Sequence, residues 1–313
     1  MRIRYYSLLV AISIFALISY AGVASTPPDE IGTQDAAFLK IDSATRPVAM
    51  GGAFVGLAND VNAVFWNPAG LVQPEKKELA TMYNSWIAGM HSASVAYSQR
   101  VSKNSAVALS MQGLWADIEG RIEDTEKPES TFGVYSYAAG LSGSYALVPK
   151  AFSLGGTIKF INQNFDIDSS NGVAADIGGL INISGLGVGF AVQNLKLQMS
   201  NDGELPLFMR VGGSYYFTKD SVVAVEYSKL GIAEPSYHIG IEKWFRSMFA
   251  LRIGYNISSG DNPKKGLSAG FGLKAYGTKP LEDMDFQLDY AYIPEPDWDS
   301  MGDTHRISMI VRF

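Results

Sequence analysis

The feature that most constrains this chain is a two-residue alternation of apolar and polar side chains, recurring from Glu78 to the last residue in segments of roughly 10 to 14 residues. In the clearest segment, Met284, Phe286, Leu288, Tyr290 and Tyr292 alternate with Asp285, Gln287, Asp289 and Ala291. Successive side chains of a strand point to opposite faces of its sheet. Each such segment therefore predicts a strand with one apolar face and one polar face.

Turn residues divide this region into fourteen predicted strands, an even number, as single-chain bacterial membrane barrels have. They span 78–87, 91–101, 105–118, 132–148, 151–164, 171–184, 187–197, 206–217, 221–230, 236–246, 248–257, 265–276, 283–293 and 304–313.

The predicted connections differ in length according to which strand they follow. Tight connections follow even-numbered strands at 102–104, 149–150, 185–186, 218–220 and 246–247. Longer, more polar connections follow most odd-numbered strands, at 119–131, 165–170, 198–205, 258–264 and 294–303. The short connection near 88–89 and the longer one at 277–282 are exceptions. Short turns at one rim and long loops at the other are typical of outer-membrane barrels.

Two other fold classes are compatible with parts of this pattern, a soluble β-sandwich and a membrane helix. A soluble β-sandwich also alternates, so alternation alone does not place these strands in lipid. Residues 177–195 form an uncharged run that a hydropathy window could read as a helix. That run contains five glycines and divides near 184–187 into two alternating halves, which indicates a hairpin. Since only helices and closed barrels satisfy all backbone groups in lipid, we predict an all-β fold, a transmembrane antiparallel β-barrel of about fourteen strands, over residues 78–313.

The first 25 residues predict a signal peptide. Arg2 and Arg4 precede an uncharged apolar run over 5–23, and small residues at 22–25 precede Pro27 and Pro28. The alternative is a single membrane-anchor helix. The chain has no cysteine, so neither a lipidated cysteine nor a disulfide can form.

The final segment carries a mark of its own. It alternates up to Phe313, and a terminal aromatic on such a strand resembles the signal read by the barrel-insertion machinery of Gram-negative envelopes. We therefore expect the cell outer membrane as the location, with membrane lipid and lipopolysaccharide around the wall. The net charge is −6, which argues against nucleic acid as a partner.

Residues 26–77 differ in character from the strands and predict a short N-terminal plug. The segment is rich in Gly, Ala and Val and is too short for an independent domain, so it must bury itself in the barrel lumen. The glycine pair permits close backbone approach, and the Asn-Pro-Ala-Gly run predicts a turn. The residues expected to carry the plug motif are Met50, Gly51, Gly52, Asn67, Pro68 and Gly70.

Residues 46–54, RPVAMGGAF, and 63–71, AVFWNPAGL, resemble the N-terminal signature of the PorV/PorQ family, and so do 302–308 and 312–313 at the end of the chain. The resemblance implies a fourteen-stranded FadL-like barrel that is not an enzyme and acts in type IX protein secretion. The implied partners are the C-terminal signal domains of secreted cargo and the translocon or surface-attachment proteins. The Asn67-Pro68-Ala69 element is shared with FadL-type plugs, so the alternative is a channel for uptake of hydrophobic small molecules.

No catalytic, metal or cofactor constellation stands out, because His91, His238 and His305 lie on different strands without ligand spacing. The charges predicted on the inner face are Arg210, Glu226, Glu242, Arg252, Asp285, Asp289, Arg306 and Arg312. They indicate ion pairs that fill the barrel and hold the plug, or else a polar conduction path.

Aromatic residues suggest two further roles. Trp86, Trp115, Trp244 and Tyr292 are expected to anchor the wall at the membrane interfaces. Trp298, within the acidic loop 293–300, either packs over the barrel mouth or offers a docking point to a protein partner. The acidic stretch 119–131 is a second candidate docking loop.

Overall fold

The computed structural model describes residues 35–86, 89–120, 130–165, 168–201, 203–231, 234–259, 265–278, 282–294 and 303–313. The predicted signal peptide and Trp298 lie outside these residues, as does most of the loop 119–131.

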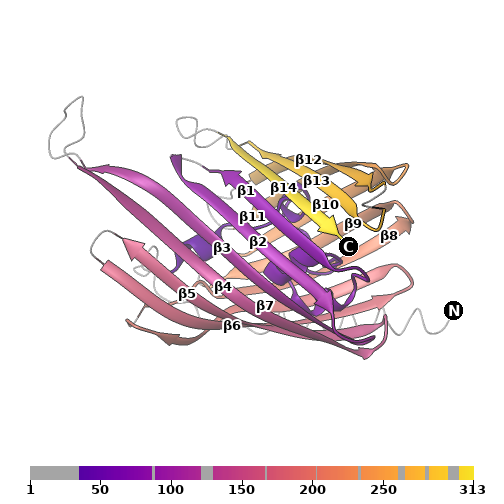
Figure 1. The fold of residues 1–313 in the computed structure, drawn as a ribbon, viewed down its shortest axis with the longest axis horizontal. Coiled ribbons are helices and arrows are strands. Elements are labelled where there is room, and N and C mark those ends of the chain that lie inside the picture. The colour runs from indigo at the N-terminus through magenta and orange to yellow at the C-terminus, as the bar shows by residue number, and fades with distance from the viewer. Residues whose placement is uncertain are drawn as a thin grey trace.

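Fourteen strands form one closed antiparallel barrel in which each strand pairs with its sequence neighbours and the first pairs with the last (Figure 1). They are β1 (Glu78–Ser85), β2 (His91–Arg100), β3 (Ser105–Gly120), β4 (Ser130–Val148), β5 (Phe152–Phe165), β6 (Asp168–Ile183), β7 (Leu186–Met199), β8 (Phe208–Thr218), β9 (Ser221–Leu230), β10 (Ser236–Phe245), β11 (Phe249–Ser258), β12 (Lys265–Tyr276), β13 (Asp285–Ile293) and β14 (Thr304–Arg312). The predicted fold class is confirmed, and strand ends differ from the prediction by at most three residues.

The alternation in the sequence separates the two faces of the wall. Leu141 and Ile253 are 61% and 62% exposed on the outside, whereas their neighbours Ser142 and Arg252 are 2% and 1% exposed. An apolar outer face and a polar inner face are what a barrel in lipid requires. The short helices within the described part of the chain lack the length and the apolar run of a membrane-spanning helix.

The two rims differ as the sequence indicates. We call the rim with the connections after even-numbered strands the turn rim and the opposite one the loop rim.

One predicted long connection, 165–170, is wrong, because β5 ends at Phe165 and β6 begins at Asp168. Polar residues there continue the ladder, with Asn162 opposite Asn171, since strand pairing satisfies the backbone whatever the side chain.

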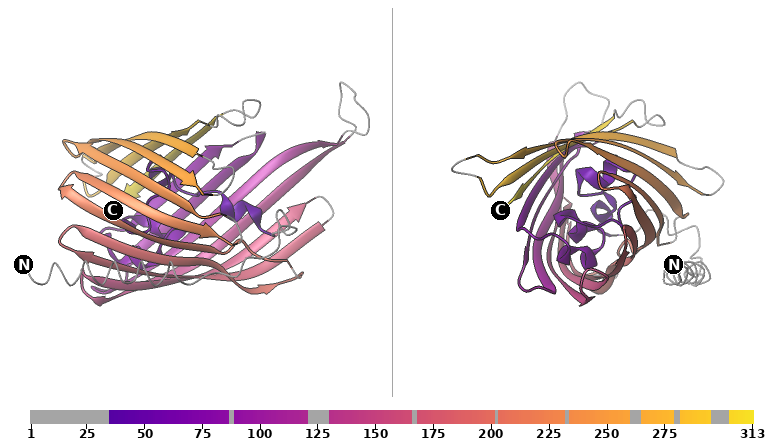
Figure 2. Two further views of the ribbon diagram at one scale, coloured as in Figure 1. Left: turned by 180° about the vertical axis from the view of Figure 1, so that it is seen from behind. Right: turned by 90° about the vertical axis from the view of Figure 1, so that its right-hand side faces the viewer.

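The segment that precedes β1 lies inside the barrel, where Figure 2 shows its short helices enclosed by the strands. We call residues 35–77 the lumenal segment. It contains η2 (Ala37–Lys40), α2 (Thr45–Ala49), η3 (Val61–Phe65) and η4 (Pro68–Val72). Its apolar side chains, including Met50, Phe54, Trp66 and Leu71, are almost fully buried and form the hydrophobic core of the molecule.

Candidate functional site

The contact between the lumenal segment and the wall is the candidate site. Glycines on both sides allow the two backbones to approach each other closely. Gly51 has a φ of +67°, which a side chain would strain. A Cβ on Gly254 of β11 would lie 1.9 Å from the Gly51 nitrogen, and one on Gly240 of β10 would lie 2.4 Å from the Met50 oxygen. Gly52, with φ +89°, faces the imidazole of His238, whose Nδ1 lies 2.6 Å from the Gly51 oxygen. The segment therefore packs backbone against backbone on this side.

The Asn-Pro-Ala-Gly turn makes a second close contact, with β6 of the wall. The Asn67 amide donates to the Val55 oxygen at 2.9 Å and to the Gly179 oxygen at 3.0 Å, and its oxygen caps η4 by accepting from the Ala69 nitrogen. A Cβ on Gly178 of β6 would lie 2.1 Å from that amide oxygen. Within the lumenal segment, a Cβ on Gly70 would lie 1.9 Å from the Ala58 oxygen.

Two wall residues bind the middle of the lumenal segment. Glu226 of β9 accepts from the backbone nitrogens of Phe54 at 2.9 Å and Val55 at 2.8 Å through one carboxylate oxygen. Its other oxygen accepts from Arg210 of β8 at 2.8 Å. The Arg210 guanidinium lies 5.4 Å from the centre of the Trp66 ring. A charged pair from the wall thus holds both backbone and side chain of the segment.

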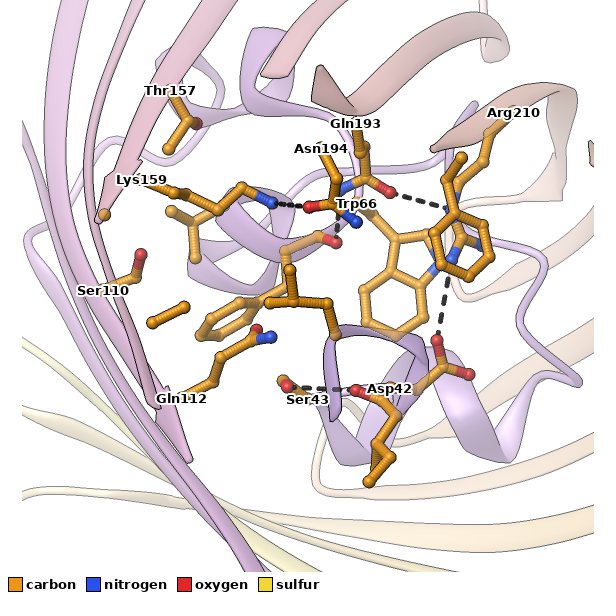
Figure 3. Close-up of a pocket in the computed structure, with 17 residues that line it drawn as sticks. Asp42, Ser43, Trp66, Ser110, Gln112, Thr157, Lys159, Gln193, Asn194 and Arg210 are labelled. Carbon is orange, nitrogen blue, oxygen red and sulfur yellow. Dashed lines mark hydrogen bonds and ion pairs between the residues drawn. The ribbon is translucent and has the colours of Figure 1, made fainter. Parts of the chain in front are cut away.

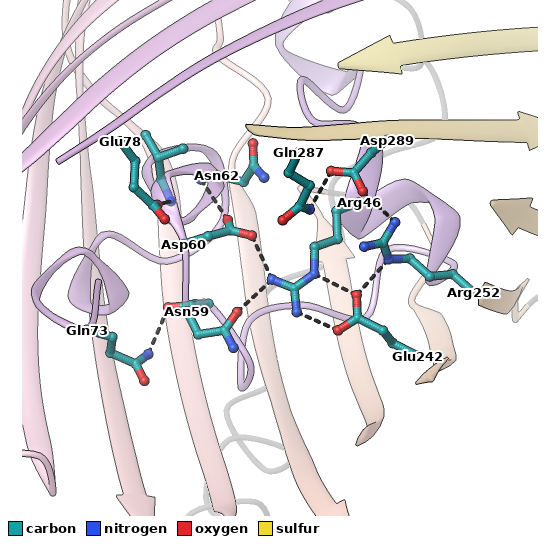
Figure 4. Close-up of polar contacts among 12 residues, drawn as sticks. Arg46, Asn59, Asp60, Asn62, Gln73, Glu78, Glu242, Arg252, Gln287 and Asp289 are labelled. Atoms are coloured by element: carbon teal, nitrogen blue, oxygen red, sulfur yellow. Dashed lines mark hydrogen bonds and ion pairs between the residues drawn. The ribbon is translucent and has the colours of Figure 1, made fainter. Parts of the chain in front are cut away.

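A longer polar network begins at Arg46 of α2 (Figure 4). Its guanidinium makes two hydrogen bonds to Glu242 of β10, at 2.7 and 2.8 Å, and a third at 2.6 Å to Asp60. Glu242 also accepts from Arg252 of β11 at 2.6 Å, and Arg252 donates in turn to Asp289 of β13 at 2.7 Å. Burial alone would lower the pKa of Arg46, but the carboxylates of Glu242 and Asp60 raise it well above its usual value.

The network returns to the segment at its far end. Gln287 donates to Asp289 at 2.7 Å and accepts from Arg312 at 3.0 Å. Arg312 donates to Glu78 at 2.5 Å, and Glu78 accepts from the Val61 nitrogen at 2.6 Å. Since both ends lie in the lumenal segment, the chain of contacts ties it to β10, β11, β13, β14 and β1.

The structure separates the predicted inner-face charges into distinct groups. Glu242, Arg252 and Asp289 belong to the Arg46 network, whereas Arg210 and Glu226 form a pair of their own. Arg306 donates to the Asp42 carbonyl oxygen, and the carboxylate of Asp42 lies 3.7 Å from Arg210.

Three network members, Arg46, Asp60 and Glu78, are absent from the sequence-based prediction. Their side chains are only 6%, 2% and 3% exposed. The sequence feature that could have identified them is a charged residue in or beside a segment that is otherwise apolar.

One predicted interface anchor is wrong. Trp244 shares the inward parity of Glu242, and its ring lies 4.1 Å from Lys274 Nζ and 5.5 Å from the Arg252 guanidinium. It lines a polar cavity of about 300 Å³ inside the turn rim. The general preference of Trp for the interface predicts an anchor here, but the two-residue parity of β10 places Trp244 in the lumen.

Two more cavities lie along the β3–β5 wall, at opposite ends of the lumen. The one nearer the loop rim is narrow, about 30 Å³, and polar, with Lys159 directed at Asn194 and with Arg210 beside Trp66 (Figure 3). The one at the turn rim measures about 610 Å³. Its lining includes the apolar residues Val72, Ala146, Val148, Pro149, Ala151 and Phe152 and the charged residues Glu75, Arg100, Lys103 and Lys150.

Phe313 lies at the turn rim, where its backbone pairs with that of Lys77 and its ring stacks on Tyr97. Within the described residues, no group of three or more His, Asp or Glu side chains has the geometry of a metal site.

The fold and its occupied lumen define a transmembrane β-barrel of the FadL-like class. Residues 13–178, just over half of the chain, match the model of the uncharacterised protein family UPF0164, and the chain belongs to that family. No curated protein sequence matches it.

Solved structures share the fold at low sequence identity. The toluene transporter TodX of Pseudomonas putida has a TM-score of 0.59 and 11% identity, covering 87% of this chain and 98% of its own. The toluene transporter TbuX of Ralstonia pickettii has a TM-score of 0.57 and 12% identity, covering the same shares of the two chains. The CymD monoaromatic hydrocarbon channel has a TM-score of 0.53 and 14% identity, covering 85% of this chain and 95% of its own. These matches show that the chain shares the fold of FadL-like barrels, and they do not confirm the PorV/PorQ resemblance.

Proposed function

We propose that this protein is a non-enzymatic channel for hydrophobic small molecules in the outer membrane of a Gram-negative-type bacterium. The structural neighbours named above are transporters and channels for monoaromatic hydrocarbons, which supports this class of substrate. The lumenal segment fills the barrel as a plug, so this is not a general diffusion pore.

The observation that carries the proposal is the apolar cavity at the turn rim. Its volume of about 610 Å³ falls in the range of roughly 300–1,000 Å³ typical of ligand pockets. An apolar cavity of only about 150 Å³ is enough to bind benzene in another protein. The cavity lies between the end of η4 at Val72 and the ends of β4 and β5 at the turn rim. Charged residues also line it, but its lining surface is mostly apolar, and its volume accommodates a monoaromatic compound.

The path through the lumen follows the same wall. The narrow cavity includes Gly140 of β4, and the wide one includes Ala146 on the same face of that strand, nearer the turn rim. Between them η4 contacts β5, because a Cβ on Gly155 would lie 2.4 Å from the Ala69 nitrogen and Ser153 donates to the Ala69 oxygen at 2.8 Å. Passage therefore requires η4 to move away from β5.

Uptake of radiolabelled toluene tests the proposal in a Gram-negative host, whose lipopolysaccharide leaflet slows passive entry. Expression of the full chain should raise the initial uptake rate, and A146W, which fills the cavity, should return it to the level of the empty vector. The matched control is L147W, at the adjacent position on the lipid face, where Leu147 is 52% exposed. Heat-modifiable migration on gels confirms equal amounts of folded barrel. Uptake equal to that of the empty vector, or equal uptake by A146W and the unmodified chain, would refute the channel.

Binding of secreted cargo and of type IX secretion partners is a second proposal, which rests on the sequence signature of residues 46–54 and 63–71. Deletion of the gene should then remove C-terminally signalled cargo from the cell surface. Unchanged surface cargo would exclude this role.

A further inference from the structure

Closure of the barrel between β1 and β14 brings two histidines from opposite ends of the chain to one place on the outer face. Ser85 of β1 lies opposite His91 of β2 on one side and opposite His305 of β14 on the other. His91 lies opposite Trp115 of β3, and His305 opposite Tyr292 of β13. We call these five residues the interfacial row.

The row points away from the lumen. Alternate residues on the same strands, Asn84, Ser92 and Arg306, are 0%, 5% and 7% exposed and face inward. Ser85 ends β1, His91 begins β2 and His305 is the second residue of β14, so the row lies at the loop rim. There the apolar outer face gives way to the lipid headgroup region.

Each histidine is oriented by a tyrosine on a neighbouring strand. The Tyr83 hydroxyl lies 2.9 Å from Nδ1 of His91, and the Tyr290 hydroxyl lies 2.8 Å from Nδ1 of His305. When the phenol donates to Nδ1, the proton of the neutral imidazole sits on Nε2. No other hydrogen bond to either ring is present within the described residues, so both Nε2–H groups are available to a ligand.

Aromatic rings flank both imidazoles. His91 lies 5.9 Å from the ring centres of Tyr83 and of Trp115. His305 lies 6.2 Å from the ring centre of Tyr290 and 5.4 Å from that of Tyr292. These contacts fix the rings against the wall and leave donors at the height of the headgroups, beside rings that suit the glycerol region of a lipid.

We propose that the interfacial row binds the phosphate groups of membrane lipids. Each imidazole Nε2–H donates to a phosphate oxygen, and the Ser85 hydroxyl between them offers a third donor. The two histidines are two strand spacings apart, about 9–10 Å, which is too wide for a single phosphate. The site therefore takes two phosphates, from two adjacent lipids or from one lipid that carries two.

Carboxylates restrict where the phosphates can lie. Asp303 accepts from the Tyr292 hydroxyl at the outer end of the row. Asp117, which is exposed, follows Trp115 by two residues on the same face of β3. Both lie farther toward the loop rim than the histidines, so the phosphates approach from the membrane side, where Ile307 is 51% and Val95 40% exposed.

The opposite wall provides a matched control. Tyr227 of β9 and Tyr237 of β10 lie opposite each other on the outer face, with ring centres 5.5 Å apart. Tyr237 is the second residue of β10, as His305 is of β14, so this pair also lies toward the loop rim. It is aromatic but contains no histidine.

Native mass spectrometry of the full chain in detergent tests the site, with cardiolipin as the two-phosphate probe and diacylglycerol as the probe without phosphate. We expect the double variant H91F/H305F to bind cardiolipin about tenfold more weakly, each single variant to fall between, and Y227F/Y237F to bind as the unmodified chain does. H91Q/H305Q should recover part of the affinity, because the amide can donate. If the double variant does not migrate as a folded barrel, the cardiolipin affinities of H91F and H305F test the site instead.

Two results would overturn the lipid site. One is equal cardiolipin affinity for H91F, H305F and the unmodified chain, which would mean that the histidines make no contact with phosphate. The other is binding of diacylglycerol as strong as that of cardiolipin, which would reduce the row to an ordinary aromatic girdle. Toluene uptake is not a readout here, so the lipid site and the channel fail independently.

Discussion

The two ends of the lumenal segment are held in different ways. Its first half, from Arg46 to Val55, contacts β8 to β13 through buried charges, glycine-lined backbone contacts and the Glu226 carboxylate. Its last part, from Pro68 to Gln73, borders the apolar cavity of about 610 Å³ on one side and contains no charged side chain, so the wall holds it mainly through bonds to its backbone oxygens and packing. We infer that the ion pairs anchor the first half, and that η4, which has no ion pair to break, is the part that moves during passage.

The largest effect is expected from breaking the anchor at Glu242. E242Q leaves Arg46 and Arg252 buried without their shared carboxylate, and loss of one member of a buried ion pair costs roughly 3–5 kcal/mol. Urea unfolding in detergent micelles measures this loss. K243Q, on the opposite face of β10, should change the free energy of unfolding by less than about 0.5 kcal/mol. Equal effects of the two variants would show that the network does not anchor the segment.

A smaller effect is expected from the backbone contact at Gly254. G254A places a methyl group against the Gly51 nitrogen, where overpacking costs roughly 1–3 kcal/mol. The matched variant is G143A on β4, where a Cβ meets nothing within 4 Å. The same unfolding measurement should separate the two, and an unchanged G254A would mean that segment and wall are not in close contact.

Removal of the Asn67 side chain tests the turn that precedes η4. N67A loses the η4 cap and leaves the Val55 and Gly179 oxygens without their donor, at a cost of about 1–2 kcal/mol. N67D keeps the capping oxygen but not the two donated bonds, so its loss should be smaller if the cap dominates. A larger loss for N67D than for N67A would assign the effect to a buried charge instead.

The smallest effect on stability is expected where η4 meets the cavity, and there the change should increase transport. Arg100 donates to the Val72 and Gln73 oxygens at the turn rim and is partly exposed, so R100Q should cost less than about 1 kcal/mol. Because it releases the end of η4, toluene uptake should rise. Lower uptake with unchanged stability would indicate that Arg100 serves the path itself and does not restrain η4.

The sequence predicted the wall well because lipid outside and a polar lumen inside impose alternation on every strand. It predicted Glu242, Arg252 and Asp289 on the inner face by parity alone. Arg46 and Asp60 could not be assigned as partners, since Arg46 meets Glu242 across 196 positions of the chain and no local pattern encodes that distance.

Closure of the barrel hides other relations from the sequence. His91 and His305 had no shared motif, and only the pairing of β1 with β14 places both beside Ser85. Trp244 is the reverse case, because the parity of its own strand predicts the lumen whereas the general preference of Trp predicts the interface. The apolar cavity depends on where η4 stops, which composition does not determine.

The most direct test of the account is protection of the turn-rim cavity by its ligand. The chain has no cysteine, so the A146C variant carries a single thiol in the cavity, and L147C carries one on the lipid face. The rate of maleimide labelling is measured in detergent at increasing toluene concentration. We predict that toluene slows labelling of A146C several-fold and leaves that of L147C unchanged. An unchanged rate for A146C would contradict the claim that this cavity holds hydrophobic small molecules.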